Sequence, residues 1–179
     1  MLYVPRWSGS FDVGDTQTIV VGASGAFGPN GTGEGAKTEI GGVDFLWKWK
    51  SPRADKGFPF VKVQSEAMWR NYDAAATLTL PPAVFQDHGV YAQVVWGIKP
   101  MWTLGARYDD VGGDVGDDPL DPRFQPRQRA SLEGTWYMTE YSKLRAQYSY
   151  DRRTDGFDDA NSVWLQFEFL LGAHAAHKF

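Results

Sequence analysis

The sequence predicts an all-β protein that folds as an antiparallel transmembrane β-barrel. Apolar and polar residues alternate along most of the 179-residue chain, which is the period of a strand with two different faces. Most alternating segments run for about nine to eleven residues, the length that a tilted strand needs to cross a membrane. The connections between the segments are short and long in turn, as in outer-membrane barrels. A mean hydropathy of −0.41 agrees with this fold, because each strand would also carry a polar inner face.

Nine segments carry the alternation. They cover residues 6–13, 17–27, 42–50, 60–70, 89–99, 101–109, 129–138, 143–151 and 161–171. The apolar side of the first four carries Trp7 and Phe11, then Ile19, Val21 and Phe27, then Val43, Phe45, Trp47 and Trp49, then Val61, Val63 and Trp69. The opposite side is rich in Lys, Arg, Glu and Gln, as expected for a water-filled lumen.

The last five segments repeat the pattern. Their apolar side carries Val90, Val94, Trp96 and Ile98, then Trp102, Leu104 and Tyr108, then Leu132, Trp136 and Met138, then Leu144, Tyr148 and Tyr150, then Val163, Leu165, Phe167, Phe169 and Leu171. Many of the 8 Trp, 8 Tyr and 11 Phe stand near a segment end. Aromatic rings in that position are typical of the girdles at membrane interfaces.

The connections assign sides to the barrel. The short ones are residues 13–16, 51–57, 99–101 and 139–142, and the long ones are residues 28–41, 71–88, 110–128 and 152–160. Because outer-membrane barrels have short periplasmic turns and longer extracellular loops, we expect the long connections outside the cell.

The number of strands leaves two interpretations, because bacterial single-chain barrels have even numbers. Either eight strands form the barrel and residues 1–15 are a periplasmic tail, or nine strands form the C-terminal part of a larger barrel. The second case needs a second copy or another chain for closure, because open strand edges are not viable in lipid. In both cases residues 1–179 are one domain, and residues 172–179 are a periplasmic tail.

Composition excludes several classes of protein. The absence of cysteine excludes a disulfide scaffold and a thiolate metal site. A net charge of −4 argues against a nucleic-acid partner. No apolar run reaches the ~18–20 residues of a membrane-spanning helix, and the first residues lack the pattern of a secretory signal peptide.

The C-terminal stretch Val163-Trp164-Leu165-Gln166-Phe167-Glu168-Phe169-Leu170-Leu171-Gly172, with the aromatic end Phe179, resembles the terminal strand and assembly signal of bacterial outer-membrane barrels. The tail from Gly172, together with Asp12-Val13-Gly14-Asp15 and Gly42-Val43-Asp44-Phe45, is similar to the C-terminal halves of porin-like proteins of the phosphate-selective type and of proteins labelled TonB-dependent receptors. The resemblance implies an assembly signal that includes Phe167, Phe169 and Phe179. It departs from the usual signal at Ala175 and His177, and nothing resembles a receptor plug.

The sequence offers no catalytic constellation, so we expect no enzyme and no cofactor. The three histidines stand outside any nucleophile motif. His174 and His177 come closest to a metal-ligand pair, but no nearby cysteine or carboxylate completes a site, and we expect no metal. The carboxylates of residues 109–121 suit Ca²⁺ or a solvated loop, and we favour the loop. The glycine-rich residues 31–35 precede no helix that could form a phosphate cradle.

The polar side of the segments carries the candidate selectivity residues. They are Lys48, Lys50, Lys62, Glu66, Arg70, Arg107, Arg129, Glu133, Arg145 and Glu168. Rings of such charges set ion selectivity in a pore, whereas in a packed eight-stranded barrel they would pair with one another. The basic excess predicts a mild preference for anions if a pore is open.

We therefore expect an outer-membrane barrel of a Gram-negative bacterium that passes small solutes or ions passively. The expected partners are outer-membrane lipids, lipopolysaccharide, the barrel-assembly machinery, and a second copy or another chain. One alternative is a small structural or adhesive barrel with a packed interior. Another is a soluble lipocalin-like binding protein.

Overall fold

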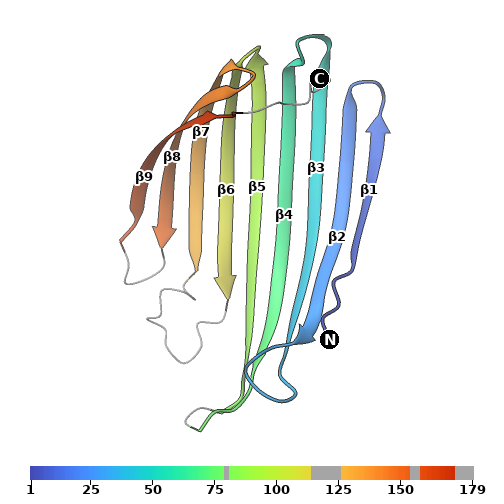
Figure 1. The fold of residues 1–179 in the computed structure, drawn as a ribbon, viewed down its shortest axis with the longest axis vertical. Coiled ribbons are helices and arrows are strands. Elements are labelled where there is room, and N and C mark those ends of the chain that lie inside the picture. The colour runs from blue at the N-terminus through green and yellow to red at the C-terminus, as the bar shows by residue number, and fades with distance from the viewer. Residues whose placement is uncertain (79–80, 114–125, 154–157, 172–179) are drawn as a thin grey trace.

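The residues that the structure describes fold as a single antiparallel sheet of nine strands, in which every strand pairs with its neighbour in sequence (Figure 1). The computed structural model describes residues 1–78, 81–113, 126–153 and 158–171. The strands are β1 (Arg6–Val13), β2 (Gln17–Pro29), β3 (Lys37–Asp55), β4 (Phe58–Ala74), β5 (Ala83–Lys99), β6 (Trp102–Gly113), β7 (Arg127–Thr139), β8 (Ser142–Arg153) and β9 (Ala160–Phe169). The all-β antiparallel sheet is confirmed, with nine strands among the described residues rather than eight.

The sheet is open in the part of the chain that the structure describes, since β1 and β9 lie at opposite ends of the strand order. Residues 6–13 form a strand and not a tail, and pair with β2 from Arg6↔Ser24 to Val13↔Gln17. Eight antiparallel steps separate the two edge strands, so β1 and β9 run in the same direction.

The connections alternate in length as expected. Short turns join β1 to β2, β3 to β4, β5 to β6 and β7 to β8 at one end of the sheet, and the longer connections lie at the other end (Figure 1). The β3–β4 turn consists of Lys56 and Gly57, with φ of 50° and 85°. A two-residue hairpin turn of this kind needs positive φ at both positions, which glycine adopts without strain.

The sequence placed several strand ends wrongly. The strand expected over 42–50 runs from Lys37 to Asp55, and the one expected from residue 89 begins at Ala83. These extensions carry polar residues on both faces, as in Lys37-Thr38-Glu39, so no alternation of hydropathy announces them. Backbone pairing continues nonetheless, for example at Lys37↔Pro29 and Ala83↔Ala74.

The two faces of the sheet differ in chemistry. The apolar face carries the outward residues of every strand, among them Val43, Trp96 and Leu132, which are 47%, 49% and 62% exposed. Within the described residues Ala36 is the one buried apolar residue. The buried polar residues Thr103, Ser131, Thr135, Ser149 and Asp151 all belong to strands β6, β7 and β8. The sheet therefore buries polar side chains and exposes apolar ones.

No helix in the described residues is long and apolar enough to cross a membrane.

Candidate functional site

The polar face is the candidate site, because it gathers the ionisable side chains predicted from the sequence. Side chains alternate between the two faces of a strand, and the pairing registers carry this alternation from strand to strand. All ten predicted residues fall on this face: Lys48 and Lys50 of β3, Lys62, Glu66 and Arg70 of β4, Arg107 of β6, Arg129 and Glu133 of β7, Arg145 of β8 and Glu168 of β9.

Asp151 of β8 is the most enclosed charge of the face. Its residue is 3% exposed, and its carboxylate accepts hydrogen bonds from Arg127 Nε at 2.9 Å and from Arg129 Nε at 2.7 Å. Two residues along, Ser149 Oγ lies 2.9 Å from Ser131 Oγ. Two cations thus satisfy one carboxylate and tie β7 to β8, as a buried charge requires.

Arg107 of β6 extends this network toward the middle of the sheet. Its guanidinium binds Asp109 through Nε at 2.8 Å and Nη2 at 2.5 Å, and its carbon lies 4.0 Å from the ring centre of Tyr91. The Tyr91 hydroxyl in turn accepts a hydrogen bond from Gln64 Nε2 at 2.9 Å. The contacts join β4, β5 and β6 across the polar face.

Further ion pairs link neighbouring strands. Lys143 lies 2.9 Å from Glu168, and Arg145 lies 3.6 Å from Glu133. Arg70 lies 2.5 Å from Asp87. These three pairs contain four of the ten predicted residues, and the pairs of Arg107 and Arg129 described above bring the number to six.

The sequence reasoning missed the partner acids Asp87, Asp109 and Asp151. Asp87 stands before the expected start of its strand, and the other two are the last residues of expected segments. Each stands an even number of positions from a polar-face residue of its own strand, for instance Asp109 from Arg107. Extending the period-two pattern past the apolar residues would have found all three.

Three lysines at the short-turn end form a different group. Lys48 and Lys62 are directly opposite each other on β3 and β4, and Lys50 faces Phe60. In the described part of the chain, neither a hydrogen bond nor an ion pair engages these three amines. Opposed like charges repel, so the arrangement needs water or counterions on this face.

The remaining residues predicted from the sequence do not belong to the polar face of the described strands. Phe167 and Phe169 are on the apolar face, whereas Phe179, His174 and His177 lie outside the described residues. The described residues contain no group of three or more potential metal ligands. Most of the acidic stretch 109–121 also falls outside the described residues.

The glycine-rich connection 31–35 is held by Asn30. Its amide nitrogen donates to the carbonyl of Asp73 at 2.8 Å, and its oxygen accepts from the Thr32 backbone N–H at 3.0 Å. This N–H is therefore already used inside the loop rather than presented to an anion.

No protein-family model matches the chain, and no solved structure matches it. An uncharacterized protein of Aquifex aeolicus (strain VF5) is 26% identical over 205 residues. The match covers 99% of this chain and 40% of that relative, so the chain spans less than half of the relative's length.

Proposed function

We propose that the nine strands form part of the wall of a β-barrel in the outer membrane of a Gram-negative bacterium. The apolar face contacts lipid, and the polar face lines a water-filled lumen through which small solutes or ions pass. The observation that carries this proposal is the shape of the exposed apolar face.

The apolar residues of that face form a continuous belt across the strands, which we call the apolar belt. In β4 it runs from Val61 to Trp69, and in β5 from Val90 to Ile98. Nine residues at about 3.3 Å each span roughly 30 Å along a strand. A strand tilted by about 35° would give the belt a height of roughly 24 Å, close to the ~25 Å band of membrane barrels.

The belt also crosses the strands at an angle, which gives the tilt independently. It is centred at Ala23 in β2, and the paired row through Ala23 reaches Arg152 in β8. Continued to the last strand, this row of paired residues meets Asp159, just before β9. The centre of the apolar belt in β9 lies near Gln166, seven positions further along the strand. The drift is about one residue per strand, and with ~4.8 Å between strands this corresponds to a tilt of about 35°. Strands of membrane barrels tilt by about 35–45°.

The exposed apolar face opposes the soluble alternative. Soluble proteins rarely leave large apolar patches in water, and a soluble binding barrel keeps its apolar residues inside. Here the inward candidates are charged, and the described residues leave their large apolar side chains exposed.

The unpaired lysines favour an open pore over a packed interior. The ion pairs of β6 to β9 alone would suit a packed barrel, in which charges must be matched. Lys48, Lys50 and Lys62 have no such match among the described residues, and a filled interior would have to bury three amines. Their position supports a lumen with a preference for anions.

Closure requires strands beyond these nine. The outer edges of β1 and β9 present unpaired backbone groups, each of which would cost several kcal/mol (~2–7) in lipid. Because the Aquifex relative is more than twice as long as the matched region, further strands of a longer polypeptide are the source we favour over a second copy.

Fractionation and conductance test the proposal. We expect the longer polypeptide that joins these nine strands to the strands closing the barrel to sediment with outer membranes, to resist carbonate extraction, and to give ohmic channels in planar bilayers. Lys48→Glu combined with Lys62→Glu should shift the reversal potential toward cation preference in a salt gradient, because both charges face the lumen. Lys37→Glu, a change of the same charge at the opposite end and on the apolar face, should leave the reversal potential unchanged. Recovery in the soluble fraction without detergent would refute the membrane location, and absence of channels would favour the structural barrel.

A further inference from the structure

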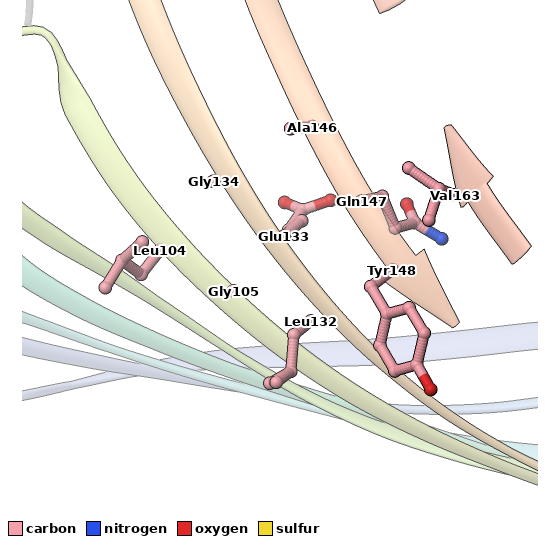
Figure 2. A pocket seen from close by; sticks show the side chains of 9 residues that line it. All are labelled: Leu104, Gly105, Leu132, Glu133, Gly134, Ala146, Gln147, Tyr148 and Val163. Atoms are coloured by element: carbon pink, nitrogen blue, oxygen red, sulfur yellow. The ribbon is translucent and has the colours of Figure 1, made fainter. Parts of the chain in front are cut away.

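The apolar face carries a depression where four strands meet. It encloses about 430 Å³ and lies over β6, β7, β8 and β9 (Figure 2). Its outward-facing lining residues are Leu104, Leu132, Gly134, Ala146, Tyr148 and Val163. Leu132 and Tyr148 point to one side of the sheet, whereas the carboxylate of Glu133 points to the other (Figure 2).

Small residues form the floor of this depression. Gly134 of β7 and Ala146 of β8 are directly paired, and Leu104 is paired with Gly134 on the other side. A Cβ on Gly134 would meet only Leu104 Cδ2, at 3.7 Å, which is ordinary van der Waals contact. The space above the floor is therefore free, and the larger side chains stand around it as walls.

A cation lies on the same face, where the apolar belt ends toward the long connections. Arg152 is four residues beyond Tyr148 on β8, a distance of about 13 Å along the strand. In the register of β7 and β8 it is paired with Gln128, whose amide nitrogen donates to Asp110 Oδ1 at 3.3 Å. The nearby Asp159 carboxylate is engaged by the Tyr150 hydroxyl and by the Arg153 backbone N–H, 3.3 Å away.

The separation between the depression and Arg152 matches the dimensions of one lipid leaflet. The hydrocarbon core of a bilayer is about 30 Å thick, so the chains of each leaflet reach about 15 Å deep. A lipid with its phosphate at Arg152 would place the end of an acyl chain over Gly134 and Ala146. Guanidinium groups are well suited to phosphate.

We propose that this surface is a lipid-binding site that holds one phosphorylated outer-leaflet lipid, chemically the lipid A part of lipopolysaccharide. An acyl chain fills the depression, and a phosphate binds the Arg152 guanidinium. The site rests on the proposed membrane location, because the long connections then face the outer leaflet, but it does not depend on conduction.

Native mass spectrometry tests the site on protein extracted from outer membranes in mild detergent. We expect lipid A–containing lipid to remain on the wild-type protein, and retention to fall by about tenfold in Ala146→Leu, which fills the floor, and in Arg152→Gln, which removes the cation. Ala92→Leu, a matched change on the same face outside the depression, and Lys37→Gln, a matched charge loss at the same end, should retain lipid as the wild type does. Circular dichroism would establish that each variant keeps its sheet.

Three outcomes would overturn the proposal: equal retention in Ala146→Leu and Ala92→Leu, retention of zwitterionic phospholipid in place of lipid A, or no retained lipid on the wild-type protein. Failure of the lipid-binding site can be distinguished from failure of the proposed membrane location and conduction. A protein recovered without membranes would refute both, whereas a membrane protein that conducts but retains no lipid would refute the site alone.

Discussion

Two residues that are adjacent in a strand lie on opposite faces of this sheet and so have different surroundings. Phe167 of β9 is 63% exposed on the apolar face, where it is paired with Leu144. The next residue, Glu168, faces the other side and lies 2.9 Å from Lys143. One step along the chain thus exchanges the proposed lipid for the proposed lumen.

Phe167→Lys should therefore impair folding far more than Glu168→Lys. A lysine near the bilayer midplane costs roughly 2–4 kcal/mol. Glu168→Lys instead places two amines side by side at a partly exposed position, which costs about 1 kcal/mol or less. Urea titration in phosphatidylcholine vesicles, followed by tryptophan fluorescence, would measure both. A larger loss for Glu168→Lys would show that the two faces are assigned the wrong way round.

Asp159, in the connection before β9, gives a residue whose titration reports local structure. The Tyr150 hydroxyl and the Arg153 backbone N–H donate to its carboxylate, and these bonds hold its pKa below the usual 3.8. Because a depressed carboxyl pKa stabilises the fold above the unfolded value, this contribution is present above pH ~3.8 and is lost as pH falls through the lower folded pKa.

Tyr150→Phe should raise the pKa of Asp159 toward 3.8, since it removes the first of these donors. Carboxyl ¹³C chemical shifts followed from pH 2 to 6 would measure the change (an interval spanning about two units on either side of the reference pKa). Tyr148→Phe, which loses a hydrogen bond to Asn161 instead, serves as the control. An unchanged titration of Asp159 in Tyr150→Phe would contradict the assignment of this hydrogen bond.

Whole strands were predictable from the sequence where one face is apolar, and less so elsewhere. Lys62, Glu66 and Arg70 alternate with Val61, Val63 and Trp69, so the face of each was readable by period two. The ends of β3 and β5 could not be predicted in this way, because polar residues occupy both faces of their extensions and hydropathy does not alternate there. The partners of the charges depend on register between strands, which hydropathy alone does not encode.

Between strands β7 and β8, Asp151→Asn should destabilise the sheet by about 2–3 kcal/mol, because it leaves Arg127 and Arg129 without their shared carboxylate. Asp110→Asn, at the same end but on the other face, should change stability by less than about 0.5 kcal/mol. The urea concentrations at which the two variants are half unfolded would measure both changes in stability. Equal midpoints would show that the Asp151 network does not hold the two strands together.

At the scale of the whole sheet, the described residues leave two edges, on β1 and β9, where backbone hydrogen bonding is incomplete. Central strands β4 and β5 are paired on both sides, whereas β1 and β9 are each paired on one side within the described residues. The alternation of apolar and polar residues predicted a sheet with two different faces, but whether its edges close could not be predicted, because the pairing of edges is not encoded in hydropathy.

Hydrogen exchange of this 179-residue chain in detergent should be faster in strands that are paired on one side than in strands that are paired on both sides. Peptides from β1 and β9 should exchange faster than those from β4 and β5, because an edge strand opens without breaking a second ladder. Mass spectrometry after timed deuteration would measure it. Protection of β1 and β9 equal to that of β4 would mean that the nine strands close on themselves, and would contradict the need for further strands.

The common direction of β1 and β9 restricts how further strands could complete the proposed barrel. Joining these two edges directly would create a parallel seam, and so would adding any even number of strands that continue the up-and-down order. A wall that is antiparallel throughout must therefore contain an odd number of additional strands. Parity alone thus predicts an even total, as bacterial single-chain barrels have, without knowledge of the sequence that supplies the rest.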